Sequence, residues 1–114
     1  MSREDIQSGL RSVRSIAAET ELFIHQVTDG RVSNAFAAAH FQYLKNQDQD
    51  VQKNLAAHSR PDEDLVVRGA RAQADALSQE LGRLASSPID GAEASLSHVA
   101  QIQEKTGALE DSLR

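Results

Sequence analysis

Histidine has the widest chemical range of the residue types in this chain, because imidazole can transfer protons, accept a phosphoryl group or bind a metal near neutral pH. The sequence contains His25, His40, His58 and His98. A di-iron site in a helical bundle requires glutamate three residues before histidine on two helices, and none of these histidines has that neighbour. Glu21 and His25 lie one helical turn apart but supply only two ligands. We therefore expect neither a metal site nor a cofactor, and a metal- or ligand-sensing bundle around this pair is a second alternative function.

His40 lies at the edge of an apolar helical stripe and is followed by Leu44, Lys45 and Asn46. This order resembles the motif of histidine-containing phosphotransfer domains, which are four-helix bundles of about this size with Leu-Lys-Gly closely following the reactive histidine. Here two extra residues are inserted and asparagine replaces glycine, which moves Lys45 off the face of the histidine. The resemblance implies a signalling domain in which His40 is the phosphoacceptor, and this is the first alternative function.

Signatures of other enzyme classes do not occur in the sequence. The chain has no cysteine, which excludes thiolate catalysis, disulfides and iron–sulfur clusters. It also has no Gly-x-Ser-x-Gly turn, no phosphate-binding P-loop and no Gly-x-Gly-x-x-Gly motif. We expect a protein that is not an enzyme.

The charge distribution argues against nucleic acid as a partner. The formal net charge is -5, and lysine and arginine occur singly rather than in a basic stripe that could follow a phosphate backbone. The chain begins Met-Ser-Arg-Glu-Asp and has no long apolar run, so we expect no signal peptide and no membrane span. A cytoplasmic location is the prediction, with export as a folded helical unit left open.

Four amphipathic segments of similar length divide the chain, at about residues 3–28, 32–58, 61–85 and 88–113. Turn-forming sequences separate them at Asp29-Gly30, Ser59-Arg60-Pro61 and Ser87-Pro88. The pattern predicts one domain over residues 1–114, folded as an all-α, antiparallel up-and-down four-helix bundle. If the first two segments formed one helix, the chain would be a two-helix hairpin that dimerises into a four-helix assembly. The apolar stripe shifts by about two residues at Gly30, which favours a reversal of the chain there.

Each segment carries an apolar stripe with helical spacing, and we expect these stripes to form the core. The first stripe is Ile6, Leu10, Val13, Ile16, Ala17, Thr20, Phe23, Ile24 and Val27. The second is Val32, Phe36, Ala39 and Tyr43, then Val51, Leu55 and His58 after a polar interval at 45–50 that predicts a kink or a bulge. The third is Val66, Ala70, Ala74, Leu77, Leu81 and Leu84. The fourth is Ala92, Leu96, Val99, Ile102, Gln103, Thr106, Leu109 and Leu113.

Some large apolar residues fall outside these stripes, although such residues are scarce because many of the hydrophobic residues are alanine. An exposed apolar patch is typical of a binding surface. We expect Phe41, Tyr43, Leu44 and Val67 to form such a patch. The predicted function is a non-enzymatic protein–protein interaction module or small assembly subunit that docks a protein partner or a second copy of itself through a helical face, with a homo-oligomer expected.

Overall fold

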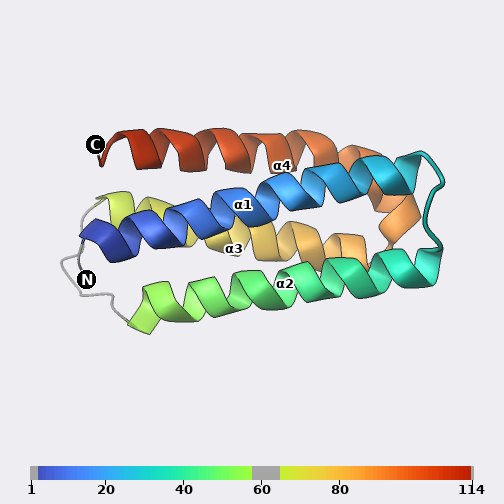
Figure 1. Ribbon diagram of the computed structural model, residues 1–114, viewed down its shortest axis with the longest axis horizontal. Coiled ribbons are helices and arrows are strands. Elements are labelled where there is room, and N and C mark those ends of the chain that lie inside the picture. Colours follow the sequence, from blue (N-terminus) through green and yellow to red (C-terminus); the bar gives the residue numbers. More distant parts are fainter. Residues whose placement is uncertain (1–2, 58–64, 114) are drawn as a thin grey trace.

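The computed structural model describes residues 3–57 and 65–113. These residues form α1 (Arg3–Thr28), α2 (Asn34–Ala57), α3 (Leu65–Ser86) and α4 (Pro88–Asp111). Figure 1 shows the four helices side by side, each antiparallel to the next in sequence. The bundle measures 45 × 23 × 17 Å. The predicted all-α, antiparallel four-helix bundle is confirmed, and no strand occurs in the described parts of the chain. Within these parts, no helix has the length and apolar content that crossing a membrane requires.

Gly30 reverses the chain between α1 and α2. It has a φ of 72°, a left-handed conformation that glycine adopts without steric cost. The Gly30 N–H donates to the Val27 carbonyl at 3.1 Å, and the Arg31 N–H donates to the Gln26 carbonyl at 3.0 Å. Together these two bonds form a Schellman motif, which satisfies two carbonyls in the last turn of α1. The alternative of one helix across Gly30, and with it the dimerising two-helix hairpin, is therefore wrong.

Replacing glycine by alanine should change the stability of the bundle in opposite directions at a left-handed position and at a position inside a helix. Gly30→Ala places a Cβ in the left-handed region and is expected to lower the free energy of unfolding by about 1 kcal/mol. Gly107→Ala, at a position within α4 where an added Cβ meets no atom within 4 Å, is expected to raise it by roughly 0.5–1 kcal/mol. Urea denaturation followed by circular dichroism measures both. Equal effects of the two substitutions would mean that Gly30 is not constrained by its φ.

The second helix begins at Asn34, two residues later than predicted. The Ser33 hydroxyl accepts a hydrogen bond from the Phe36 N–H at 3.1 Å and so caps the first turn. The predicted beginning of the third helix at Pro61, and the predicted core residue His58, lie outside the described residues.

The buried residues of α1, α3 and α4 follow the predicted stripes closely. Val66, Leu96, Gln103 and Leu109 are half-buried rather than buried, and Val67 takes the buried place beside Val66. Thr20 and Thr106 are fully buried, and each satisfies its hydroxyl by donating to the carbonyl one turn earlier in its own helix. The thin core therefore accommodates polar side chains without unpaired hydroxyl groups at these two layers.

The predicted core stripe of α2 is wrong in the first half of the helix, where Phe36, Ala39 and Tyr43 are exposed, whereas Leu55 of the second half is buried as predicted. The buried residues of this helix are Ala37, Phe41, Leu44, Asp48 and Leu55. Their spacing of four, three, four and seven residues is a heptad pattern that continues through the polar interval, with Asp48 in a core position. The helix is continuous from Asn34 to Ala57, so the interval at 45–50 does not interrupt it as a bulge. Phe36 and Tyr43 lie on the outer side of α2 instead.

Neighbouring helices pack unequally. The contacts of α1 with α4 and of α2 with α3 are the most extensive, whereas α1 and α2 touch over a smaller area. Polar contacts add to the α1–α4 pair, because Gln103 Nε2 donates to Glu21 at 2.8 Å and Arg14 lies 3.4 Å from Glu110. The α1–α2 face is thus the least closely packed junction between consecutive helices.

Candidate functional site

The aromatic residues of the chain form one cluster near the Gly30 turn. The sequence has three phenylalanines, one tyrosine and no tryptophan. The Phe23 ring of α1 lies 5.1 Å from Phe41, 6.0 Å from Phe36 and 4.2 Å from His40, measured between ring centroids. His40 is also 5.9 Å from Tyr43 and stacks parallel to Phe36 at 6.2 Å. The cluster therefore joins α1 to α2 and includes an imidazole.

Three members of the cluster form what we name the aromatic ridge: Phe36, His40 and Tyr43. Their spacing of four and three residues places them on one side of α2, next to α1. Phe36 is 56% exposed and Tyr43 is 54% exposed, while His40 is half-buried. Beneath the ridge, Phe23 and Phe41 are buried in the core. Phe36 is therefore held against the buried Phe23 ring and Tyr43 against His40, each with about half of its surface in water.

The α1–α2 face continues from the ridge into a small cavity. Seven residues line this cavity of about 190 Å³: Asp5, Ser8, Gly9, Ser12, Val51, Asn54 and Leu55. Leu55 approaches α1 at Gly9, where an added Cβ would lie 3.0 Å from the leucine side chain. Between ridge and cavity, Gln47 donates a hydrogen bond to the Tyr43 hydroxyl at 2.9 Å. The face therefore combines exposed aromatic rings with a hollow lined mostly by polar residues, in which Val51 and Leu55 are the apolar side chains.

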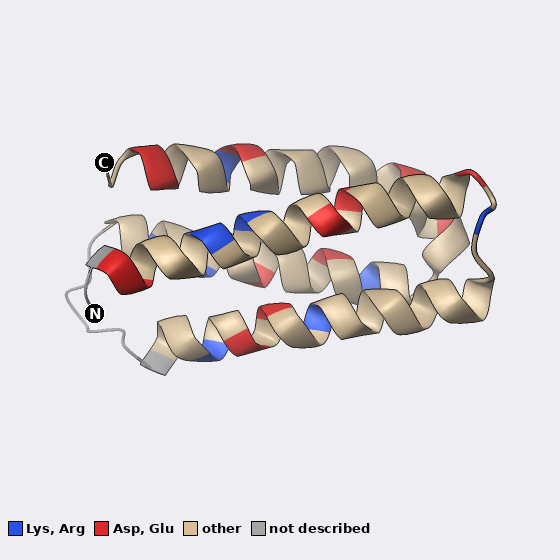
Figure 2. Cartoon of the chain, viewed as in Figure 1, with Lys and Arg blue, Asp and Glu red and all other residues tan. Residues whose placement is uncertain are grey.

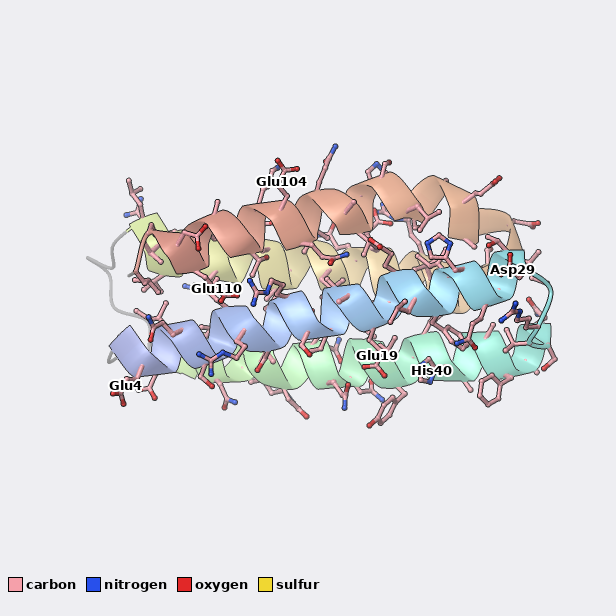
Figure 3. The ribbon with its side chains drawn as sticks, turned by 45° about the horizontal axis from the view of Figure 1, so that its top comes forward. Glu4, Glu19, Asp29, His40, Glu104 and Glu110 are labelled. Carbon is pink, nitrogen blue, oxygen red and sulfur yellow. The ribbon has the colours of Figure 1, made fainter. Side chains whose placement is uncertain are left out.

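Acidic side chains border this face. Asp5 lines the cavity, and Glu19 comes four residues before Phe23 on the side of α1 that faces the ridge. Figure 3 shows Glu19 projecting from α1 beside His40 of α2. Arg14 of α1 is turned the other way, towards Glu110 of α4. In the view of Figure 2, the lysines and arginines are scattered over the helices rather than gathered on one face.

The predicted patch of Phe41, Tyr43, Leu44 and Val67 does not exist as a surface. Phe41 and Leu44 are fully buried and Val67 is nearly so, because the heptad that forms the core of α2 runs through positions 41 and 44. Only Tyr43 is exposed. Phe36, which the sequence pattern assigned to the core, is the exposed residue that joins Tyr43.

His40 is packed between aromatic rings rather than beside a cation. Lys45 lies about 140° around α2 from it, since residues of an α-helix advance about 100° each. The Lys45 amine instead reaches α3, where it lies 3.2 Å from the place a Cβ on Gly82 would occupy. The lysine of the phosphotransfer motif is therefore not positioned to stabilise a phosphoryl group on His40.

Glu21 and His25 gain no further ligand from the other helices. Glu21 accepts a hydrogen bond from Gln103 of α4, and His25 is exposed. Within residues 3–57 and 65–113, no three histidine, aspartate or glutamate side chains come together in a way that could hold a metal ion.

Glu80 is a buried carboxylate that the sequence pattern did not reveal. One of its oxygens lies 2.5 Å from Arg83 and 3.0 Å from His98 Nδ1, and the other accepts a hydrogen bond from Ser95 at 2.9 Å. Two of these partners belong to α4, so the cluster joins α3 to α4. The spacing of Ser95 and His98 by three residues was the only signal in the sequence, and it does not identify their partner.

Asp48 is a second buried carboxyl group, in the core between α2 and α3. The Ser78 hydroxyl lies 2.6 Å from Asp48 Oδ2 and 3.0 Å from Gln52 Oε1, and it has one proton for two acceptors. A protonated Asp48 resolves this competition, because it donates to Ser78 while Ser78 donates to Gln52. Burial raises the pKa of Asp48 to about 7, although the Ser78 bond lowers it, and nearby Asp75 adds to the rise. The second oxygen, Oδ1, has no hydrogen-bond partner.

The α1–α2 face is the strongest candidate for a functional surface in the described chain, because it alone combines clustered exposed aromatic residues with a hollow between helices. The two buried carboxyl groups instead join helices to one another. In the comparisons with known proteins, the chain matches no protein-family model, and neither a curated protein nor a solved structure is significantly similar to it.

Proposed function

We propose that this protein is a non-enzymatic interaction module that binds a protein partner on its α1–α2 face, with the aromatic ridge as the anchor. The observation that carries the proposal is the exposure of Phe36 and Tyr43 in a chain whose core includes several alanines, two threonines and an aspartate. An apolar side chain that packed inward would be worth about 1.5–3 kcal/mol to folding. Phe36 and Tyr43 leave about half of their surface in water, so they gain only part of this stabilisation. Their exposure therefore favours a role in binding a partner.

The ridge has the properties of a binding anchor. Aromatic residues are enriched at the centres of protein interfaces because they bury a large area with few rotatable bonds. The buried Phe23 ring contacts both Phe36 and His40 and is itself packed against Phe41, so Phe36 and His40 are already ordered before a partner binds. Ordering a side chain at an interface costs about 0.5–1.5 kcal/mol, and a supported ring avoids part of this cost.

The packing of the bundle favours the same face. Because α1 and α2 make fewer contacts with each other than the other consecutive pairs do, a partner helix can pack along their outer junction while the α1–α4 and α2–α3 pairs stay intact. The positions of the ridge, separated by four and three residues, match the spacing by which helices recognise one another. Neither the phosphorelay through His40 nor metal sensing through Glu21 and His25 has a comparable observation in its favour.

Site-specific photocross-linking in the cells that make the protein tests this function. The photoreactive amino acid p-benzoylphenylalanine replaces Tyr43 in one variant and Ile89, which is 58% exposed on α4, in a matched control. We expect a discrete adduct from position 43 and none from position 89. Adding Phe36→Ala to the position 43 variant should reduce the adduct about tenfold or more, as for the loss of an interface anchor.

Two results would contradict the proposed function. One is the absence of an adduct from position 43 when the protein is folded, and the other is the same set of adducts from positions 43 and 89. An adduct with twice the 12.4 kDa mass of the chain would identify a second copy as the occupant, as expected for a homo-oligomeric assembly subunit.

A further inference from the structure

We propose that the α1–α2 face binds an amphipathic helix whose apolar stripe is flanked by lysine or arginine. This inference rests on the proposed function, since it names the chemistry of the partner that the same face would take. It adds the sign of the partner's charge, its secondary structure and its approximate length.

The charge of the partner follows from the residues around the face. Asp5 lines the cavity, and Glu19 lies beside the ridge (Figure 3). Asp50 comes seven residues after Tyr43 and three after Gln47, which places this exposed acid along the same side of α2. None of the seven residues lining the cavity is a lysine or an arginine. Arg11 comes three residues after Ser8 and is an exposed cation at the α1 border of the face. The three acids outnumber this arginine, so the rim of the face is predominantly acidic.

An acidic rim selects a basic partner over a second copy of the chain. A symmetric dimer through this face would bring Asp5, Glu19 and Asp50 of one copy towards the same acids of the other. Each copy also carries a net charge of -5. Like charges brought together at an interface disfavour association, whereas opposite charges speed the encounter and fix its orientation.

The shape of the face indicates a helix of about five turns. From Phe36 to Leu55 the face follows 19 residues of α2, which corresponds to about 28 Å at about 1.5 Å per residue. A parallel or antiparallel helix of about 20 residues would cover that length. Its apolar stripe would contact Phe36, Tyr43 and Val51, with its basic residues beside the acids on both borders.

Tyr43 supplies the signal for a direct test, because it is the only tyrosine and the chain has no tryptophan. The probes are two synthetic 20-residue amphipathic peptides without aromatic residues. They share one leucine stripe, and their polar faces carry lysine and arginine in one peptide and glutamate in the other. Each is titrated into the protein at about 50 mM salt while the Tyr43 fluorescence is recorded.

We expect the basic peptide to change the Tyr43 fluorescence saturably and to bind at least about tenfold more tightly than the acidic one. Phe36→Ala should weaken its binding about tenfold or more. Glu19→Gln should weaken it about twofold to fivefold, because this charge lies at a partly screened rim. Glu104→Gln, which removes an exposed acid on α4 (Figure 3), is the charge-matched control and should leave the affinity unchanged.

Different experimental results would overturn the basic partner and the proposed binding function. Equal binding of the two peptides, weakened in both cases by Phe36→Ala, would overturn the basic partner and leave a docking face without charge preference. Absence of binding by the basic peptide would overturn the inference, while cross-linking at position 43 reports on the function independently. Binding of the basic peptide that neither Phe36→Ala nor Glu19→Gln weakens would overturn the inference and count against the face itself.

Discussion

Asp48→Asn is expected to remove a loss of stability that the wild-type bundle shows as the pH rises from about 4 to about 7. Burial raises the pKa of Asp48 from 3.8 to about 7. Below the lower value the carboxyl group is protonated in both the folded and the unfolded chain, so its contribution does not change with pH. Between the two values the unfolded chain releases the proton and the folded chain keeps it, so rising pH favours unfolding.

The expected size of this effect is large for a bundle of this length. At about 1.4 kcal/mol for each pH unit between the two pKa values, the loss reaches at most about 4 kcal/mol above pH 7. Relaxation of the protein and entry of water around the ionised group reduce that value. Asparagine keeps the shape of the side chain, and its amide can donate to the Ser78 hydroxyl as the protonated acid does.

Urea denaturation of wild type and Asp48→Asn at pH 5 and pH 8 measures this prediction. The free energy of unfolding of Asp48→Asn, relative to that of the wild type, should be higher at pH 8 than at pH 5 by up to about 3 kcal/mol. Asp50→Asn, two residues away and exposed, is the control for general charge effects and should show no such difference. A stability gap between wild type and Asp48→Asn that is equal at both pH values would show that Asp48 is ionised in the folded protein throughout this range.

Phe41→Ala is expected to lower the free energy of unfolding by about 3–5 kcal/mol, whereas Phe36→Ala should lower it by less than about 1 kcal/mol. Phe41 is fully buried and meets the Phe23 ring at 5.1 Å, so its removal leaves a cavity in the core. Phe36 has more than half of its surface in water, and its loss leaves no enclosed space.

Chemical denaturation of the two variants under the same conditions tests this difference. The pair is closely matched, since both are phenylalanines of α2 that contact Phe23. If Phe36→Ala destabilised the bundle as much as Phe41→Ala, the ridge would be part of the core, and its exposure would not support a binding role.

The sequence predicted the fold because three of the four apolar stripes are nearly free of charged residues and because Gly30 marks the reversal. In the first half of α2 it predicted the wrong side of the helix. Two apolar patterns compete there, and the true one passes through Asp48, which lies in the polar interval that predicts a kink or a bulge. The pattern from Ala37 through Phe41, Leu44 and Asp48 to Leu55 keeps heptad spacing over most of the helix. This continuous heptad spacing, with one carboxyl group at a core position, indicates the buried side of α2 better than the interrupted apolar stripe does.

The error in α2 also explains the error in the site. With the core stripe placed on Phe36 and Tyr43, the pattern leaves Phe41 and Leu44 for the surface. The pattern assigns Tyr43 to both the stripe and the patch, and its exposure agrees with the patch. The contacts of Glu80 with Ser95 and His98 were out of reach of the sequence, because they depend on which faces of α3 and α4 meet and no spacing along one helix encodes that.

Mapping the binding surface by nuclear magnetic resonance tests the central claim most directly. The uniformly ¹⁵N-labelled protein is mixed with a clarified extract of the cells that make it, and the loss of each amide signal is compared with that in buffer. We predict losses concentrated on the α1–α2 face, at residues such as Gly9, Phe36, His40 and Tyr43, and their reversal by Phe36→Ala. Losses concentrated on α3 and α4, or none on any helix, would mean that the aromatic ridge does not bind a partner.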